Sequence, residues 1–145
     1  MKRSIAAALM MLAIVGCGGS VPSDTPVPSG SATPIPTSPG PRPASPAVLT
    51  IVSPTDGQVI TGTTVHVVLG LTGATIVAAT TTSIRPDQGH VHLYVDGNLV
   101  SMNYQLTQDL PVTTGTYVLK AEFVAADHAP FNPRVWSDQV VFTVK

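Results

Sequence analysis

Residues 89–104, with the sequence GHVHLYVDGNLVSMNY, decide the fold that this chain can adopt. Apolar and polar residues alternate over residues 91–95. This period of two is typical of a β-strand, whose successive side chains leave opposite faces. Asp96-Gly97-Asn98 follows with residues that tolerate the positive φ of a hairpin turn, and the alternation then resumes. The stretch predicts a β-hairpin with one apolar face and one polar face, and the polar face carries His90 and His92.

The remainder of residues 48–145 contains further short segments of apolar and β-branched residues, separated by turns rich in proline, glycine and aspartate. We expect strands at residues 48–53, 59–60, 63–71, 76–82, 91–95, 99–104, 117–126 and 139–144, with loops at 83–89, 105–115 and 127–138. No helical period of useful length occurs between them. The pattern therefore predicts a single all-β sandwich with the length of an immunoglobulin-like domain.

Turn and core residues of this region resemble those of the bacterial immunoglobulin-like domains found in exported proteins. The matching residues are Ser53-Pro54, Asp56-Gly57, 59–63, 93–97, 114–119, Ala125-Ala126-Asp127 and 140–144. The resemblance implies an immunoglobulin-like β-sandwich over residues 48–145. It says little about function, because one fold serves many functions.

The N-terminus has the pattern of an export signal. Basic Met1-Lys2-Arg3 precedes an apolar run at residues 5–15, which is too short for a membrane span of about 20 residues. It has the length of a signal-peptide core. The run ends in Ile14-Val15-Gly16-Cys17, which resembles the lipobox of bacterial lipoproteins. The resemblance implies a signal peptide at residues 1–16 and lipidation of Cys17. The alternative is a plain signal peptide with a chance cysteine.

A lipidated Cys17 would anchor the exported protein to the bacterial cell membrane, with the folded domain on the extracytoplasmic side. The segment that follows, residues 17–47, is dominated by proline, serine, threonine and glycine, and holds nine of the 14 prolines. It cannot bury enough apolar surface to fold by itself. We expect a disordered, extended tether that holds the domain at residues 48–145 away from the membrane.

The histidines of the hairpin are candidate metal ligands. His90 and His92 lie two residues apart on one strand face, so their Cα atoms are about 6.6 Å apart. Imidazole suits copper and zinc. In an immunoglobulin-like order the strand that ends at residue 126 is the neighbour of this strand, which would bring Asp127 and His128 to the same tip.

The expected site is therefore His90, His92 and His128, with Asp127 or Asp87 as a fourth ligand. The motif of two histidines separated by one residue is weak. The simpler alternative is that these histidines are solvated residues on an exposed face and in a loop.

Two other residues with metal-binding side chains are assigned elsewhere. Met102 alternates with apolar neighbours, and a two-residue turn would place it opposite Val91 or Leu93 on the core face. Only a three-residue loop would place it opposite His92. His66 stands alone on another strand, and we expect it to be a surface residue.

Phe131, Arg134 and Trp136 lie in or just after the long loop expected at residues 127–138. Aromatic residues and arginine dominate contact energies, so the three could form an exposed interaction patch. They could equally close the end of the core beneath the loop. Because the chain has few aromatic residues, we favour closure of the core.

Composition narrows the classes of function. Charged residues make up 10% of the chain and the net charge is −1, which leaves no basic face for nucleic acid. The sequence shows no nucleophile motif, no paired acids for acid–base catalysis and no phosphate loop, so we do not expect an enzyme. We expect a non-catalytic binding, interaction or structural module at the cell envelope, without a cofactor and with a protein or envelope polymer as partner. The alternative is an envelope copper or zinc protein that uses the histidine cluster.

Overall fold

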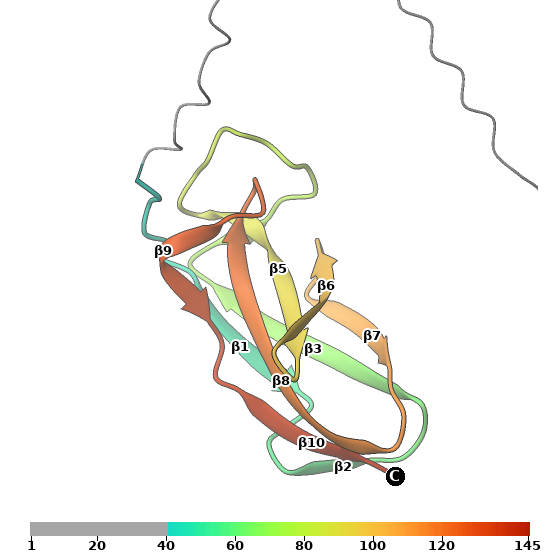
Figure 1. Ribbon diagram of the computed structural model, residues 1–145. Helices are drawn as coiled ribbons and strands as arrows, with labels where there is room; N and C mark the ends of the chain where they lie inside the picture. Colours follow the sequence, from blue (N-terminus) through green and yellow to red (C-terminus); the bar gives the residue numbers. More distant parts are fainter. Residues whose placement is uncertain (1–40) are drawn as a thin grey trace, which may run out of the picture. The chain divides into compact units, whose positions relative to one another are not determined.

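Two β-sheets pack face to face in the computed structural model, which describes residues 41–145 (Figure 1). The strands of this part are β1 (Val48–Ser53), β2 (Gln58–Ile60), β3 (Thr64–Thr72), β4 (Thr75–Ile76), β5 (Gln88–Val95), β6 (Asn98–Asn103), β7 (Thr107–Pro111), β8 (Gly115–Ala125), β9 (Pro130–Trp136) and β10 (Val140–Val144). The fold is the expected all-β sandwich. Nowhere in residues 41–145 does a helix have the length and apolarity needed to cross a membrane.

The smaller sheet has the order β1-β3-β7, and both of its ladders are antiparallel. The larger sheet has the order β2-β10-β8-β5-β4, with β6 paired to β5 and β9 paired to β8. Strands β5 and β8 run side by side through the middle of this sheet (Figure 1). Their pairing confirms that the strand carrying His90 and the strand before His128 are neighbours.

The core lies between the two sheets and follows from the alternation in the sequence. On β3, Val65 and Val67 are fully buried while His66 between them is exposed, as expected for a surface histidine. On β5, Val91 and Leu93 are fully buried and face the smaller sheet. The residues between them, His90 and His92, therefore lie on the outer face of the larger sheet.

Two segments predicted as loops contain strands. The connection at residues 105–115 holds β7, whose only buried residue is Leu110, so the segment lacks the apolar alternation that predicts a strand. The loop at residues 127–138 holds β9, in which Pro130 and Pro133 suggested a break. Both prolines are tolerated because β9 pairs with β8 alone, at an edge where a missing N–H is not required. Conversely, most of the strand expected at residues 76–82 is not a strand in the structure, where only the two-residue β4 forms.

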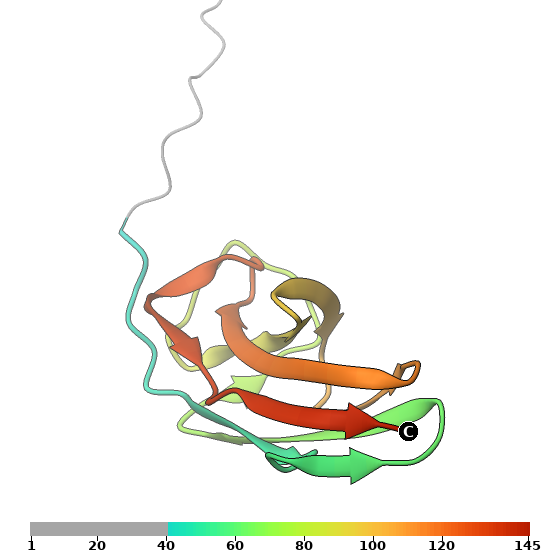
Figure 2. The ribbon, with the colours of Figure 1, turned by 60° about the horizontal axis from the view of Figure 1, so that its bottom comes forward.

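The packed part of the chain begins before the expected boundary at Val48. Ala47 is buried in the core, and the backbone N–H of Asn132 donates to the carbonyl of Pro43. The guanidinium of Arg42 donates to the carboxylate of Asp127. Figure 2 shows this segment running past β9 towards β1. The predicted signal peptide, the lipidation site and the tether up to residue 40 lie outside the described residues.

Candidate metal centre

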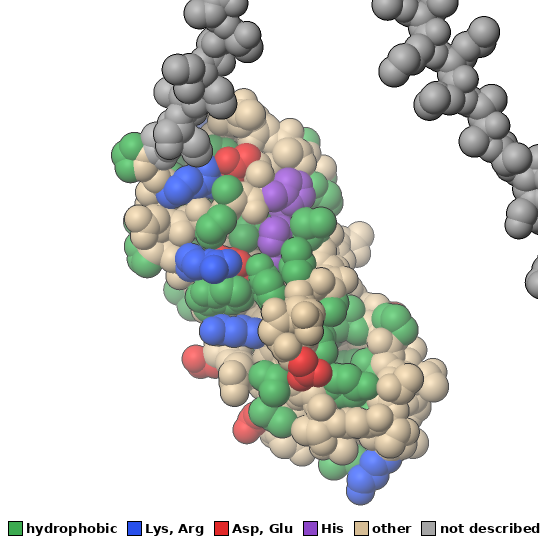
Figure 3. Space-filling model, viewed as in Figure 1, with side chains coloured by type: hydrophobic (Ala, Val, Ile, Leu, Met, Phe, Trp, Pro, Cys, Tyr) green, Lys and Arg blue, Asp and Glu red, His purple; other side chains and the backbone are tan. Residues whose placement is uncertain are grey.

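Three histidines converge on the outer face of the larger sheet. His90 and His92 come from β5, and His128 comes from the turn between β8 and β9. Each offers a ring nitrogen within 4.8 Å of those of the other two. The ring centroids are 4.1 Å apart for His90 and His128, and 5.2 Å apart for His90 and His92. Figure 3 shows histidine side chains gathered at one end of this face.

The histidines on β5 are buried, although they lie outside the core. The exposed fraction is 0% for His90 and 5% for His92, and His128 is half-buried. The rings of Tyr104 and His128 cover His90 at centroid distances of 5.0 and 4.1 Å. The interpretation of these residues as solvated surface histidines was therefore wrong, because chain segments distant in sequence cover this end of β5.

The turn that presents His128 is fixed by its neighbours. His128 adopts a positive φ of 66°, and its backbone N–H donates to the carbonyl of Ala125 at 2.9 Å. The carboxylate of Asp127 accepts two hydrogen bonds from Arg42, at 2.7 and 2.8 Å, and a third from the backbone N–H of Ala129. The hydrogen bonds from Arg42 lower the pKa of Asp127. This ion pair ties the turn to the segment before β1.

The predicted fourth ligands are not part of the cluster. The carboxylate of Asp127 is engaged by Arg42 and lies outside the group of converging histidines. Asp87 is half-exposed and interacts with Arg85 at 3.4 Å. The structure thus assembles the three predicted histidines and leaves out both aspartates, each of which interacts with an arginine.

Burial keeps the imidazoles in the form that binds metal. Burial, followed by the positive charges that His128 and His92 carry when protonated, lowers the pKa of His90 to about 4, against the opposing effect of the Asp127 carboxylate. Burial also lowers the pKa of His92, against the opposing effect of the Glu122 carboxylate. Both rings are therefore neutral at pH 7. Neutral imidazole is the metal ligand, so an ion need not displace a proton from either ring.

Two buried ring nitrogens make no hydrogen bond to protein: Nδ1 of His90 and Nε2 of His92. An unpaired buried polar atom costs about 1–3 kcal/mol. In contrast, Nε2 of His128 accepts from or donates to the hydroxyl of Thr80 at 3.0 Å, and Thr80 also contacts the Tyr104 hydroxyl at 3.3 Å. The cluster combines one oriented histidine with two that lack hydrogen-bond partners at a ring nitrogen.

The dimensions suit a small transition-metal ion. Nitrogen–metal bonds of about 2.0–2.1 Å in a tetrahedral site place two ligand nitrogens roughly 3.3 Å apart. Nε2 of His90 and Nδ1 of His128 are 2.7 Å apart and would separate slightly, whereas the widest separation of 4.8 Å would close. Three protein ligands with one open position are a known arrangement for zinc.

Met102 is not a core residue. The β5–β6 register is Tyr94 with Leu99, but Leu93 with Ser101, so Val100 is an extra residue on β6. Because of this bulge, the side chains after Val100 lie on the opposite face of the sheet from the one predicted. Met102 is the cross-strand partner of His92 and has an exposed fraction of 57%. The prediction of a core position failed because it assumed an unbroken ladder.

The predicted aromatic patch divides into two parts. Phe131 is 1% exposed and stacks on Phe123 at a centroid distance of 5.6 Å, so it closes the core as favoured. Trp136 and Arg134 lie instead on the outer face, beside a hollow of about 360 Å³.

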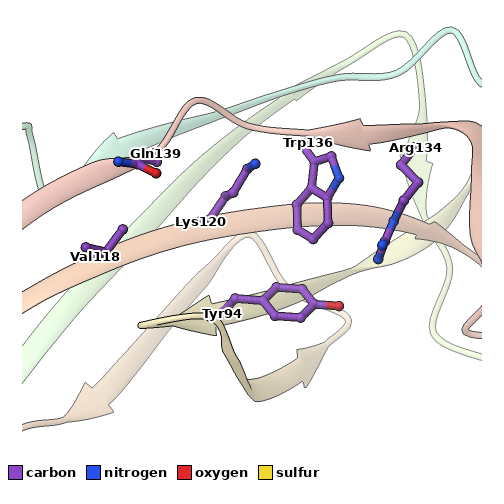
Figure 4. Close-up of a pocket in the computed structure, with 7 residues that line it drawn as sticks. Tyr94, Val118, Lys120, Arg134, Trp136 and Gln139 are labelled. Atoms are coloured by element: carbon purple, nitrogen blue, oxygen red, sulfur yellow. The ribbon is translucent and has the colours of Figure 1, made fainter.

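Figure 4 shows Trp136 between Lys120 and Arg134, with Tyr94 facing it. The Lys120 ammonium and the Arg134 guanidinium each lie 4.6 Å from the centroid of the Trp136 ring. Arg134 and the Tyr94 hydroxyl both donate to the buried carboxylate of Glu122, and the hydrogen bond from Arg134 raises the pKa of that guanidinium.

Sequence reasoning missed four residues around this site. They contact the cluster or its neighbours from different parts of the chain: Arg42, Thr80, Tyr104 and Glu122. Only Tyr104 could have been linked to the site from the sequence, because it lies two residues after Met102 in the alternating pattern and belongs to the same predicted face. The other three depend on contacts between segments far apart in sequence.

No family model and no curated protein matches the chain. Among solved structures, it is similar to the fibronectin(III)-like modules of CbhA from Clostridium thermocellum, with 22% identity and a TM-score of 0.49 over 68% of this chain and 46% of that chain. It is also similar to the endo-beta-1,4-mannanase from Thermotoga petrophila, with 16% identity and a TM-score of 0.44 over 68% of this chain and 20% of that chain. The matched part is less than half of either structure.

Proposed function

We propose that this protein is a non-catalytic binding module that holds one copper or zinc ion through His90, His92 and His128. The observation that carries the proposal is the convergence of three imidazoles, whose nitrogens lie within 4.8 Å of one another. Two of these rings also have a buried nitrogen without a hydrogen-bond partner. A metal ion bound at Nε2 of His92 would satisfy one of these nitrogens, which otherwise costs free energy.

The donor set indicates the class of metal. Imidazole suits copper and zinc, whereas magnesium and calcium prefer carboxylate and carbonyl oxygens. The nearby carboxylates of Asp127 and Glu122 are both engaged by arginine. The site therefore offers nitrogen and few free oxygen donors, which favours the later transition metals.

The proposal includes a location. Residues 14–17 have the lipobox pattern, and residues 17–47 have the composition of a tether. We propose an exported lipoprotein, attached to the bacterial cell membrane through a lipid on Cys17, with the metal site on the extracytoplasmic side. The support for this location is the sequence of the N-terminal segment.

A second candidate function is capture of a protein or envelope polymer at the hollow beside Trp136. The observation that favours it is a half-buried tryptophan flanked by Lys120 and Arg134 around a hollow of about 360 Å³. Aromatic residues and arginine are enriched where binding energy is concentrated. Substitution Trp136→Ala would abolish such capture and leave metal binding unchanged.

The test of the metal proposal is calorimetric titration with zinc(II) and copper(II) in a buffer that does not chelate. We would use the full chain in detergent with Cys17→Ser, so that the thiol of its one cysteine cannot bind metal. We expect one ion per chain with micromolar affinity or tighter, weakened at least about tenfold by His92→Ala or His128→Ala. The matched control is His66→Ala, an exposed histidine outside the cluster, which should bind as the parent does. A folded parent that gives no heat would contradict the proposal.

A further inference from the structure

We infer that Met102 is the fourth ligand of the histidine site, and that the site is built for copper(I). This inference rests on the proposed function and specifies its metal. It starts from the bulge at Val100, which sets the register of β6 against β5. Without the extra residue, the ladder that begins with Val95 opposite Asn98 would pair Met102 with Val91, on the core face.

The bulge moves Met102 to the histidine face. Past Val100, the cross-strand partner of His92 is Met102, and directly opposed residues in an antiparallel pair share one face. Such residues have Cβ atoms about 4.5–5.5 Å apart, within reach of a long thioether side chain. Bulges often redirect side chains next to functional sites.

Tyr104 provides independent support for this placement. It lies just beyond the end of β6, and one further pair in the β5–β6 ladder, after Val91 with Asn103, would set it opposite His90. The ring of Tyr104 lies 5.0 Å from the ring of His90. The end of β6 therefore lies against the histidine cluster.

Met102 is also the cross-strand neighbour of His92 that is free to act as a ligand. His92 has two cross-strand neighbours, Met102 on β6 and Glu122 on β8. Both oxygens of Glu122 accept hydrogen bonds from Arg134, and one also accepts from Tyr94. Met102 has no such engagement, and 57% of its surface is exposed. A large apolar side chain exposed beside buried histidines is accounted for if the thioether completes a metal site.

The chemistry of the fourth donor selects the metal. Soft thioether and thiolate ligands favour copper(I), whereas zinc takes imidazole together with thiolate, carboxylate or water. Three imidazoles and one thioether give copper(I) four donors without a net protein charge. Zinc would use only the three imidazoles and leave Met102 aside.

The test measures copper(I) and zinc(II) affinities of the full Cys17→Ser chain with and without Met102→Leu, a substitution that keeps size and removes sulfur. Copper(I) is supplied anaerobically with ascorbate and competed with the chromophoric chelator bicinchoninate. We expect Met102→Leu to weaken copper(I) binding at least about tenfold, and to change zinc(II) binding by less than about twofold. X-ray absorption of the copper(I) form should show a sulfur neighbour that Met102→Leu removes.

The outcomes separate the two claims. Equal copper(I) affinities in the parent and in Met102→Leu, with binding lost in His128→Ala, would overturn the role of Met102 and leave the histidine site standing. A parent that binds neither metal would overturn both. Met1, Met10 and Met11 are present in both chains being compared, so a sulfur signal that persists in Met102→Leu would count against Met102.

Discussion

Nε2 of His90 lies 2.7 Å from Nδ1 of His128, although 38 residues separate the two in sequence. One ring is held by strand β5 and the other by a turn that the ion pair between Arg42 and Asp127 joins to the segment before β1. The approach of the two rings is thus a property of the folded domain as a whole. Each part of this arrangement can be tested separately.

Arg42 is expected to position His128 without touching the metal. Removing its side chain leaves the half-buried carboxylate of Asp127 without its partner and frees the turn. We expect Arg42→Ala to weaken zinc(II) binding about tenfold, the scale seen when residues that orient metal ligands are removed. The measurement is calorimetric titration. The control is Arg85→Ala, which removes an exposed arginine with a longer contact to Asp87. Equal weakening by both substitutions would exclude a specific role for Arg42.

The metal-free domain should lose stability as the pH falls. The pKa of His90 is about 4 in the folded chain, whereas the unfolded chain has the ordinary value of 6.5. Between these two values the unfolded state binds more protons than the folded state. The contribution of neutral His90 to the stability of the folded domain is therefore complete above pH 6.5 and is lost as the pH falls towards 4. The lowered pKa of His92 acts in the same direction.

We expect the free energy of unfolding in urea with EDTA to be about 2 kcal/mol lower at pH 5.0 than at pH 7.5. His90→Gln removes the titrating ring, so the difference should shrink in that variant. A difference of the same size in His90→Gln would assign the pH dependence to other groups.

Phe131 and Trp136 should differ sharply in their effect on stability. Phe131 is buried against Phe123, so Phe131→Ala creates a cavity and should cost about 3–5 kcal/mol. Trp136 is half-buried on the outer face, where its contacts with Lys120 and Arg134 contribute about 1 kcal/mol. Chemical denaturation of the two variants measures both values. A larger loss in Trp136→Ala would mean that the tryptophan, and not Phe131, closes the core.

The lipid anchor predicts a change in cellular location. Wild-type protein should sediment with membranes after cell lysis, and Cys17→Ser should lose lipidation and appear in the soluble or membrane-released fraction. The control is Ser20→Ala, which changes a neighbouring residue and keeps the cysteine. Membrane retention of Cys17→Ser equal to that of wild type would rule out anchoring by a lipid on Cys17.

The sequence allowed prediction of those features that depend on local pattern. The hairpin was predicted from the alternation around His90 and His92, and the pairing of β5 with β8 placed His128 beside them as expected. The burial of these histidines could not be predicted, because it depends on Tyr104 and on the distant turn that carries His128.

The position of Met102 was predicted wrongly for a different reason. A single extra residue at Val100 reverses every side chain after it, and no residue in that stretch signals a bulge. The expected role of Asp127 as a ligand failed because its partner, Arg42, comes from a segment assigned to the tether. Register shifts and long-range ion pairs are determined by the whole fold, so a local pattern does not reveal them.

The most direct measurement is anomalous diffraction from crystals of the Cys17→Ser chain grown with one equivalent of zinc(II), recorded above and below the zinc absorption edge. We predict one anomalous peak that is absent below the edge and that contacts ring nitrogens of His90, His92 and His128. A peak found only beside exposed His66 and Asp109, or no peak at all in crystals of the folded chain, would contradict the proposed metal centre.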